Sequence, residues 1–419
     1  MQECYLPTGN EWVSLPTLQA RTGALESFSF LHMGYKGLIE QRGGASLPLM
    51  TPFFETEGER ASLQSLTWGR KSDWIPTFCG TAGSLAVEGM LLAPVGERGF
   101  LYQLTVRSTS DKPLSSTFGL EGCWASAWHC VNEDKEIDGA RRCYTSLWND
   151  SLIFDMRCGL PLFAFAPMMD QPCSSTFQET DAGIVYRLAH ACTLEPGEAV
   201  TVTFYWGVGF EEVAAATSAK EMLRQGWQHE LQVTTDWLDA RRWPIPDAQL
   251  ERLYNTNLFF CLFYSAGITL DTEELVLVTS RSPRYYVSAA YWDRDSLLWS
   301  FPTVVDADPA LARRMLDYVF GRQRRNLGVH SRYIDGTVLE PGFELDELMA
   351  PVLALERYVG ATGDRDCLED NAIRSGLTDI LRTLRTKRHR SIALYETFLQ
   401  PTDDVRSYPY PVSYTHLTL

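Results

Sequence analysis

The chain has 419 residues and a formal net charge of -16 at pH 7. This length exceeds the usual size of one domain and predicts two units with substantial cores. The acidic balance disfavours nucleic acid and anionic membrane surfaces as partners, because their phosphates require a basic footprint. A neutral ligand suits the charge better, and the 12% of aromatic residues fits either stacking on carbohydrate rings or two aromatic-rich cores.

Cysteine spacing and the first residues limit cofactors and location. The ten cysteines form no CxxC pair and no zinc-ligand spacing, so we expect reduced thiols and neither a metal nor another cofactor. Residues 1–16 contain no basic segment followed by an apolar stretch, and no run of 18 apolar residues occurs anywhere. We therefore expect a cytoplasmic protein with no membrane partner.

Residues 25–210 consist of short runs in which apolar residues alternate with others. Residues 100–106, 151–156 and 199–206 are examples, and the period of two predicts strands. Turn-forming segments separate the runs, and no long helical repeat intervenes. We predict an antiparallel β-sandwich over residues 1–210.

The pattern becomes helical after residue 210. Residues 211–246 are predicted to form a helical linker, and about five helices follow between 247 and 386, with a sixth near 405. Asp247 is a predicted cap, with Leu250, Leu253, Tyr254, Leu258 and Leu262 on the apolar face of its helix. Asp308-Pro309 opens another helix, Gly360 ends a third and Asp366 opens a fourth.

Every second helix is preceded by a long loop. These loops cover residues 279–291, 328–343 and 393–410, whereas the other connections are short. Alternation of this kind indicates helical hairpins arranged around a common centre, with the long loops at one end.

Each long loop brings acidic residues to the start of its helix. The three sets are Asp293 and Asp295; Glu344, Asp346 and Glu347; and Glu396, Asp403 and Asp404. Capping by the helix dipole explains any one set. Three sets in series indicate a shared site instead.

Arg294 and Asp295 stand side by side after Trp292. A guanidinium fork and a carboxylate match neighbouring sugar hydroxyls, while a tryptophan face covers the apolar side of the ring. The alternative is a buried ion pair that holds two helices together. Arg332 is a further candidate for holding a sugar, and His330 is expected to be an ordinary hydrogen-bonding residue rather than a metal ligand.

Three short motifs occur in a fixed order. They are Trp292-Asp293-Arg294-Asp295-Ser296, Glu344-Leu345-Asp346-Glu347-Leu348-Met349-Ala350-Pro351, and Pro401-Thr402-Asp403-Asp404. In this order they resemble the six-hairpin glycosidases, whose catalytic domain is an (α/α)6 barrel that often follows a β-sandwich. Within that group they are most similar to the metal-independent exo-α-1,6-mannosidases, and glucoamylases share the Trp-x-Arg-Asp start.

The resemblance, which covers about residues 247–410, implies an inverting exo-α-glycosidase that acts on α-mannosides or α-glucosides in an oligosaccharide or glycan. It implies that Arg294 and Asp295 bind hydroxyls of the terminal sugar, that Glu344 and Asp346 line its pocket, and that Asp403 or Asp404 is the general acid. Residue chemistry adds Trp292, Arg332 and Glu396 as substrate-binding candidates. A debranching α-glucosidase, a sugar phosphorylase and a non-catalytic carbohydrate-binding protein remain alternatives.

The chain after Asp247 is too short for a complete (α/α)6 barrel. Twelve helices need more than twice the 172 residues (419 − 247) that follow Asp247. We therefore expect residues 247–412 to form the first half of a barrel, the catalytic base to lie beyond Leu419, and this chain to be inactive. Residues 413–419 resemble a non-native tail.

Overall fold

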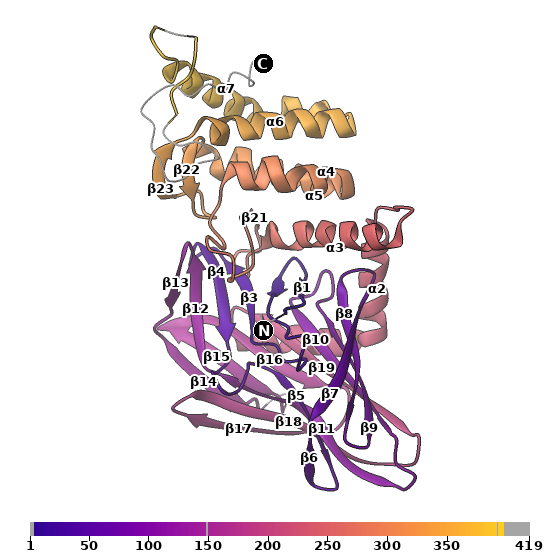
Figure 1. Cartoon of the computed structure of the whole chain (residues 1–419). Coiled ribbons are helices and arrows are strands. Elements are labelled where there is room, and N and C mark those ends of the chain that lie inside the picture. The colour runs from indigo at the N-terminus through magenta and orange to yellow at the C-terminus, as the bar shows by residue number, and fades with distance from the viewer. Residues whose placement is uncertain (1–3, 148–149, 392, 398–419) are drawn as a thin grey trace.

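A computed structural model describes residues 4–147, 150–391 and 393–397. Strands occupy the first part of the chain and helices the second, as Figure 1 shows. We call residues 4–209 the β region and residues 248–386 the helical region. The strands of the β region pair antiparallel with one another.

Three sheets make up the β region. The first runs in the order β1 (Thr8–Gly9), β2 (Val13–Leu15), β3 (Ser27–His32), β4 (Gly37–Arg42), β12 (Ser126–Val131) and β13 (Glu133–Glu136). The second runs β14 (Ala140–Thr145), β15 (Leu152–Cys158), β16 (Leu160–Met169), β19 (Ala199–Gly209), β10 (Gly99–Ser108), β9 (Leu85–Leu92), β8 (Ile75–Ala82) and β7 (Leu63–Lys71). The third runs β17 (Ser174–Thr180), β18 (Gly183–Leu194), β11 (Leu114–Trp124), β5 (Thr51–Thr56) and β6 (Glu59–Ala61).

The three sheets share one apolar core. Phe30 of the first sheet, Phe165 and Trp206 of the second, and Trp124 of the third are buried together. The predicted runs at 100–106 and 199–206 lie within β10 and β19, and β15 covers the run at 151–156 except Ser151, which confirms these runs as strands. Residues 99–104 of β10 are buried on both faces, because the second face packs toward the helices. Alternation is therefore weak where the sheet is covered twice.

The predicted linker, residues 211–246, is helical over residues 212–225 and 227–239, and its first helix packs on the β region. It contains α1 (Glu212–Gln225) and α2 (Trp227–Asp239). Ala215, Ala216 and Ala219 of α1 pack on β16 and β19. A Cβ atom at Gly207 would lie 2.1 Å from the carbonyl oxygen of Ala215, so this glycine permits the close approach of helix and sheet.

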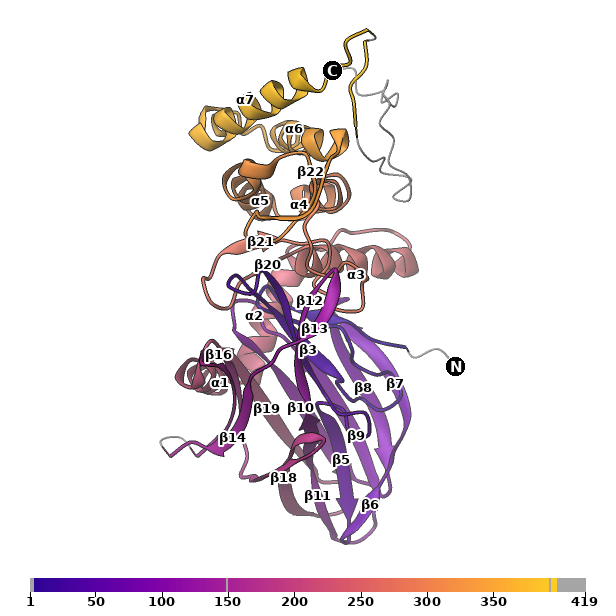
Figure 2. The same ribbon diagram turned by 90° about the vertical axis from the view of Figure 1, so that its left-hand side faces the viewer.

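The helices of the helical region lie one above another, rising away from the β region (Figures 1 and 2). They are α3 (Ala248–Tyr264), the π-helix η1 (Arg294–Ser300) continued by α4 (Phe301–Ala307), α5 (Pro309–Gly321), α6 (Leu345–Thr362) and α7 (Asn371–Thr386). Short elements connect them: β20 (Ala266–Ile268), β21 (Leu275–Leu277), the 3-10 turns η2 (Gln323–Asn326) and η3 (Asp366–Glu369), and the hairpin of β22 (Val329–Arg332) and β23 (Val338–Phe343). Among the described helices, none is long and apolar enough to cross a membrane.

The predicted starts of the helices agree with the structure better than the predicted buried faces do. Asp247 and Asp308 cap α3 and α5 as predicted. Leu250 and Leu253 were expected in the core but are 51% and 61% exposed, because α3 packs through its second half, where Leu258 and Leu262 are buried.

Two predicted helix boundaries move by a few residues. Helix α6 continues through Gly360 and ends at Gly363, whose φ of 74° is the left-handed conformation that glycine adopts without strain. Asp366 opens only a 3-10 turn, and Asp370 caps α7 through hydrogen bonds to the backbone of Ala372 and Ile373.

Arg281 joins the two regions at their contact. Its side chain is fully buried, and Nη1 donates to the carbonyl oxygens of Asn10 in the β region (2.5 Å) and Phe263 in α3 (2.8 Å). Burial lowers the pKa of Arg281 to about 10, so the guanidinium stays charged at neutral pH. One cation thus ties together the backbones of both regions.

Glu230 of α2 is a buried carboxyl at the same junction. Its side chain is 3% exposed, and Oε1 has no hydrogen-bond partner among the described residues. Burial, together with the charges of Glu97 and Glu221, raises the pKa of Glu230 from 4.5 to about 7.

This shift predicts that the protein loses stability as the pH rises. Because the folded-state pKa is raised, the contribution of Glu230 is fully present below pH 4.5 and is lost as the pH rises through about 7. Glu230→Gln should be more stable than the wild type at pH 8 by about 1 kcal/mol, after allowance for solvent screening, and similar at pH 4.5. Urea unfolding from pH 4.5 to 8 measures this, with the exposed Glu356→Gln as control; parallel curves for Glu230→Gln and wild type would contradict it.

Candidate functional site

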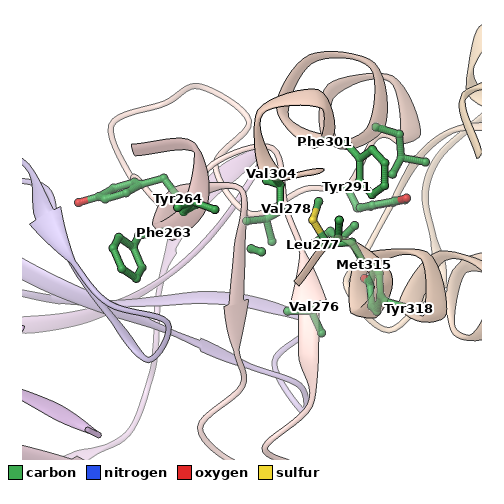
Figure 3. Close-up of a cluster of buried hydrophobic side chains, with 14 of the residues drawn as sticks. Phe263, Tyr264, Val276, Leu277, Val278, Tyr291, Phe301, Val304, Met315 and Tyr318 are labelled. Carbon is green, nitrogen blue, oxygen red and sulfur yellow. The ribbon is translucent and has the colours of Figure 1, made fainter. Parts of the chain in front are cut away.

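Three segments of the helical region meet at their charged residues. They are residues 291–294 at the start of η1, residues 329–332 of β22, and residues 344–347 at the start of α6. The backbones of Tyr291 and Arg332 exchange hydrogen bonds of 2.9 and 3.0 Å. Figure 3 shows Tyr291 beside Phe301 and Met315 in the apolar core, and its ring makes an edge contact with Tyr318. The site is therefore fixed to the core through Tyr291.

The inner part of the site consists of Tyr291, Asp293, Arg332 and Glu347, and we call it the inner group. Arg332 forms an ion pair with Asp293, which also accepts a hydrogen bond from the Tyr291 hydroxyl. Glu347 lies 3.7 Å from Arg332 and accepts hydrogen bonds from the backbone nitrogens of Asp293 (2.6 Å) and Arg294 (3.3 Å). The first turn of α6 thus caps the start of η1.

The outer part consists of Trp292, Arg294, His330, Glu344 and Asp346, and we call it the outer group. Arg294 Nη1 lies 2.9 Å from Asp346 Oδ2 and 3.2 Å from Glu344 Oε2. His330 Nδ1 lies 3.2 Å from the same Glu344 oxygen, and its ring meets Trp292 edge-on at 5.6 Å. Apart from the fully buried Glu344, the outer group is slightly exposed: the side chains of His330 and Arg294 are 14% and 7% exposed, whereas that of Arg332 is 0% exposed.

Negative charge is in excess in the two groups. Four carboxyls face two guanidiniums, a formal balance of 2 − 4 = −2 when His330 is neutral. Burial lowers the pKa of Arg294, but the charges of Glu347, Asp346 and Glu344 outweigh it and raise that pKa. Burial raises the pKa of Asp346 against the opposing charge of Arg294, and raises the pKa of Glu347 well above its usual value. The site therefore retains protons more readily than separate carboxyls would.

Apart from His330 Nδ1, which contacts Glu344 as an ion pair, four buried polar atoms of the outer group have no hydrogen-bond partner among the described residues. They are Trp292 Nε1, Arg294 Nε, Glu344 Oε1 and Asp346 Oδ1. Buried polar groups are nearly always hydrogen-bonded, and leaving one without a partner costs about 1–3 kcal/mol. Two donors and two acceptors in one place form a set that hydroxyl groups, each both donor and acceptor, can satisfy.

Asp295 faces a different neighbourhood from Arg294. It lines a cavity of about 340 Å³ together with Phe260, Thr279, Ser280, Ser282, Arg284, Tyr285, Trp299 and Ser300. Trp299, one helical turn further on, is 60% exposed. Arg294 thus contacts the buried charge network while Asp295 lines this cavity, and the expectation that both bind one sugar stays a prediction.

A π-helix shapes this part of the chain. The backbone nitrogen of Phe301 bonds the carbonyl oxygen of Ser296, five residues earlier. Pro302 follows directly; it has no N–H, and its ring would clash with the carbonyl four residues before it in a regular α-helix. We attribute the widened turn to this proline, since π-turns relieve such conflicts.

Other predicted site residues are placed differently from expectation. Arg332 was expected to hold the sugar, but it has no exposed surface and serves the inner group, because Asp293 and Glu347 neutralise it there. Glu396 is exposed, and its backbone nitrogen donates a 2.8 Å hydrogen bond to the carbonyl oxygen of Lys387. Asp403 and Asp404 lie outside the described residues.

Two residues contribute to the site in ways that the sequence did not predict. His330 was set aside as an ordinary hydrogen-bonding residue, although its position two residues before Arg332 on a strand predicts the same face. Thr397 was not considered; its hydroxyl accepts a hydrogen bond from the backbone nitrogen of Leu345 and so caps α6 from 52 residues away. A sequence pattern around Leu345 cannot predict a cap that is supplied by a residue so far along the chain.

No protein-family model matches the chain, and no curated protein sequence matches it. Solved structures do. A structure assigned as a kojibiose phosphorylase from the human microbiome superposes on 94% of this chain with a TM-score of 0.60 and 11% identity. A bacterial glucoamylase, solved with acarbose, superposes on 92% with a TM-score of 0.52 and 11% identity. The chain shares its fold with these two enzymes, and it spans 59% of the length of each.

We predict that Arg332 is essential for folding stability. Arg332→Met removes the cation from between two buried carboxyls and should lower the free energy of unfolding by about 3–5 kcal/mol, because an uncompensated buried charge remains. Arg357→Met, which breaks an exposed ion pair, should cost less than about 1 kcal/mol.

A second substitution separates charge from packing. Adding Asp293→Asn to Arg332→Met removes the stranded charge and should restore part of the loss. Urea unfolding of all four proteins measures these differences. A loss below 1 kcal/mol for Arg332→Met would show that the inner group is solvated rather than buried.

Proposed function

We propose that the protein acts on α-linked sugars and that the outer group holds the terminal sugar. The observation that carries this proposal is the set of four buried polar atoms without partners, on Trp292, Arg294, Glu344 and Asp346. Adjacent hydroxyls of a sugar would donate to the two carboxylate oxygens and accept from the indole and guanidinium nitrogens. Entry of the sugar requires the rim formed by Trp292 and His330 to shift, because these atoms are out of contact with solvent.

The likeness of fold supports the same class of chemistry. Both similar structures carry names of sugar-cleaving enzymes, a phosphorylase and a glucoamylase. The cavity lined by Asp295, the residue after Arg294, supplies the exposed ring of Trp299 and several hydroxyl side chains. A substrate that extends from the outer group into this cavity would meet aromatic and polar surfaces suited to a second sugar ring.

The proposed activity is that of an inverting exo-α-glycosidase on α-mannosides or α-glucosides. Half of an (α/α)6 barrel is the proposed architecture of the helical region. The motif resemblance assigns the general acid to Asp403 or Asp404, which would protonate the glycosidic oxygen while a water attacks from the opposite face. Phosphorolysis differs only in the attacking group, so the sugar phosphorylase is the alternative, and the fold likeness to one favours testing it.

Because this chain is expected to be inactive, the activities are distinguished on a longer protein that includes the expected catalytic base, by product analysis with maltose, kojibiose and α-1,6-mannobiose. Free monosaccharide in phosphate-free buffer establishes a hydrolase, and a sugar phosphate formed only with phosphate present establishes a phosphorylase. Asp403→Asn with Asp404→Asn should lower either rate by about 10²–10⁴-fold. Unchanged turnover in this double variant would remove both residues from the acid role.

Binding tests the outer group separately from turnover. Asp346→Asn should weaken disaccharide binding about 10-fold or more, because a hydrogen bond to a charged group is lost. Asp306→Asn, at an exposed position on α4, is the matched control. Binding without turnover would indicate a carbohydrate-binding protein, and the absence of binding to all three disaccharides would reject the proposal.

A further inference from the structure

His330 stands between two carboxylates. Its Nδ1 lies 3.2 Å from Glu344 Oε2 at the start of α6, and its Nε2 lies 3.5 Å from Glu340 Oε2 on β23. Glu340 is itself held by the hydroxyl of Ser331 (3.2 Å) and by the side-chain amide of Asn132 from the β region (3.4 Å). A continuous set of contacts thus leads from the β region through Glu340 and His330 to Glu344.

Glu344 is engaged at one oxygen only. Oε2 is approached by both Arg294 and His330, whereas Oε1 is buried and has no hydrogen-bond partner among the described residues. Glu344 precedes the first residue of α6 but makes no side-chain cap to its own helix. A carboxylate fixed at one oxygen presents the other in a defined direction, and such fixed acceptors bind ligands with less loss of entropy.

We propose that His330 is a positioning residue of the sugar site, which holds Glu344 so that its second oxygen accepts a hydrogen bond from a hydroxyl of the bound sugar. This inference rests on the proposed function and adds a residue that neither the motifs nor the fold likeness assigns. His330 acts through Glu344, while its own ring, edge-on to Trp292, forms part of the rim.

The arrangement makes sugar binding depend on pH. The charged groups that face His330 are Glu344 from α6, Glu340 from β23 and Arg294 from η1. Burial lowers the pKa of His330, but Glu344 and then Glu340 outweigh burial and raise it above 6.5. The imidazolium is therefore present in acid and is lost as the pH rises through that higher value. Its loss restores the full excess of negative charge and leaves Arg294 as the remaining cation at Glu344 Oε2.

The test is the affinity for maltose and α-1,6-mannobiose, measured by calorimetry on the full chain from pH 5.5 to 8.5. Wild-type affinity should fall about 10-fold or more across this range. In His330→Asn, whose side chain cannot titrate, affinity should be low and nearly independent of pH. Glu340→Gln should shift the midpoint to lower pH, because it removes a charge that favours the imidazolium.

His229→Asn, at an exposed position on α2, is the matched control and should keep the wild-type profile. Thermal unfolding confirms that each variant is folded, and the NMR titration of the His330 ring in the wild type measures its pKa with and without sugar. A rise of that pKa on sugar binding supports the inference even if His330→Asn does not fold.

The outcomes separate the inference from the proposed function. If the wild type binds sugar and His330→Asn keeps the same affinity and pH profile, the inference fails while the function stands. If the wild type binds neither disaccharide at any pH, the proposed function fails and the role of His330 fails with it.

Discussion

Two guanidiniums inside the helical region determine how its parts fit together. Removing an arginine from water costs several kcal/mol unless carboxylates and carbonyls replace the lost hydration. Arg332 obtains these partners from Asp293, just before η1, and from Glu347 of α6. Arg294, the first residue of η1, obtains them from residues 344–347 at the start of α6. The starts of two helices and one strand are thereby held within hydrogen-bonding distance. Displacing any one of these three segments would leave a charge without a partner.

The positions of the outer-group residues depend on the ion pairs of Arg332 and Arg294. Glu347, shared by both arginines, links the buried ion pairs to the residues at the rim. The β region adds support from outside: Lys36 pairs with Asp335 in the hairpin loop, and the hydroxyl of Ser288 bonds the carbonyl oxygen of Cys130. The long loops that carry the site are therefore held from below by the β region as well as from within, which gives that region a structural role in the site.

The sequence predicted the features that depend on near neighbours along the chain. The strands and the helix caps at Asp247 and Asp308 depend on residues within a few positions, and they are found where expected. Features that depend on distant partners were not predicted. The apolar spacing predicts that Leu250 is buried, but the structure leaves it exposed. The position of Glu347 in the first turn of α6 suggests a cap for that helix, but its side chain caps η1 instead.

The division of Arg294 from Asp295 is a case of the same kind. The motif identifies both residues, but their directions depend on a π-turn whose hydrogen bonds cannot be inferred from apolar spacing. The sequence likewise contains His330 but does not predict its contacts. These follow from the positions of Glu340 and Glu344 in the folded chain.

Arg281 has a consequence for how the chain can be divided. Composition changes near residue 210, which invites the view that strands and helices are independent modules. Yet the guanidinium of Arg281 solvates the carbonyl of Asn10, and the side chain of Asn10 in turn fixes its own turn and the loop after β9. Separating the two regions would break these hydrogen bonds and expose the groups that make them to water. The change in composition near residue 210 therefore lies within a chain whose β region and helical region share a buried polar contact.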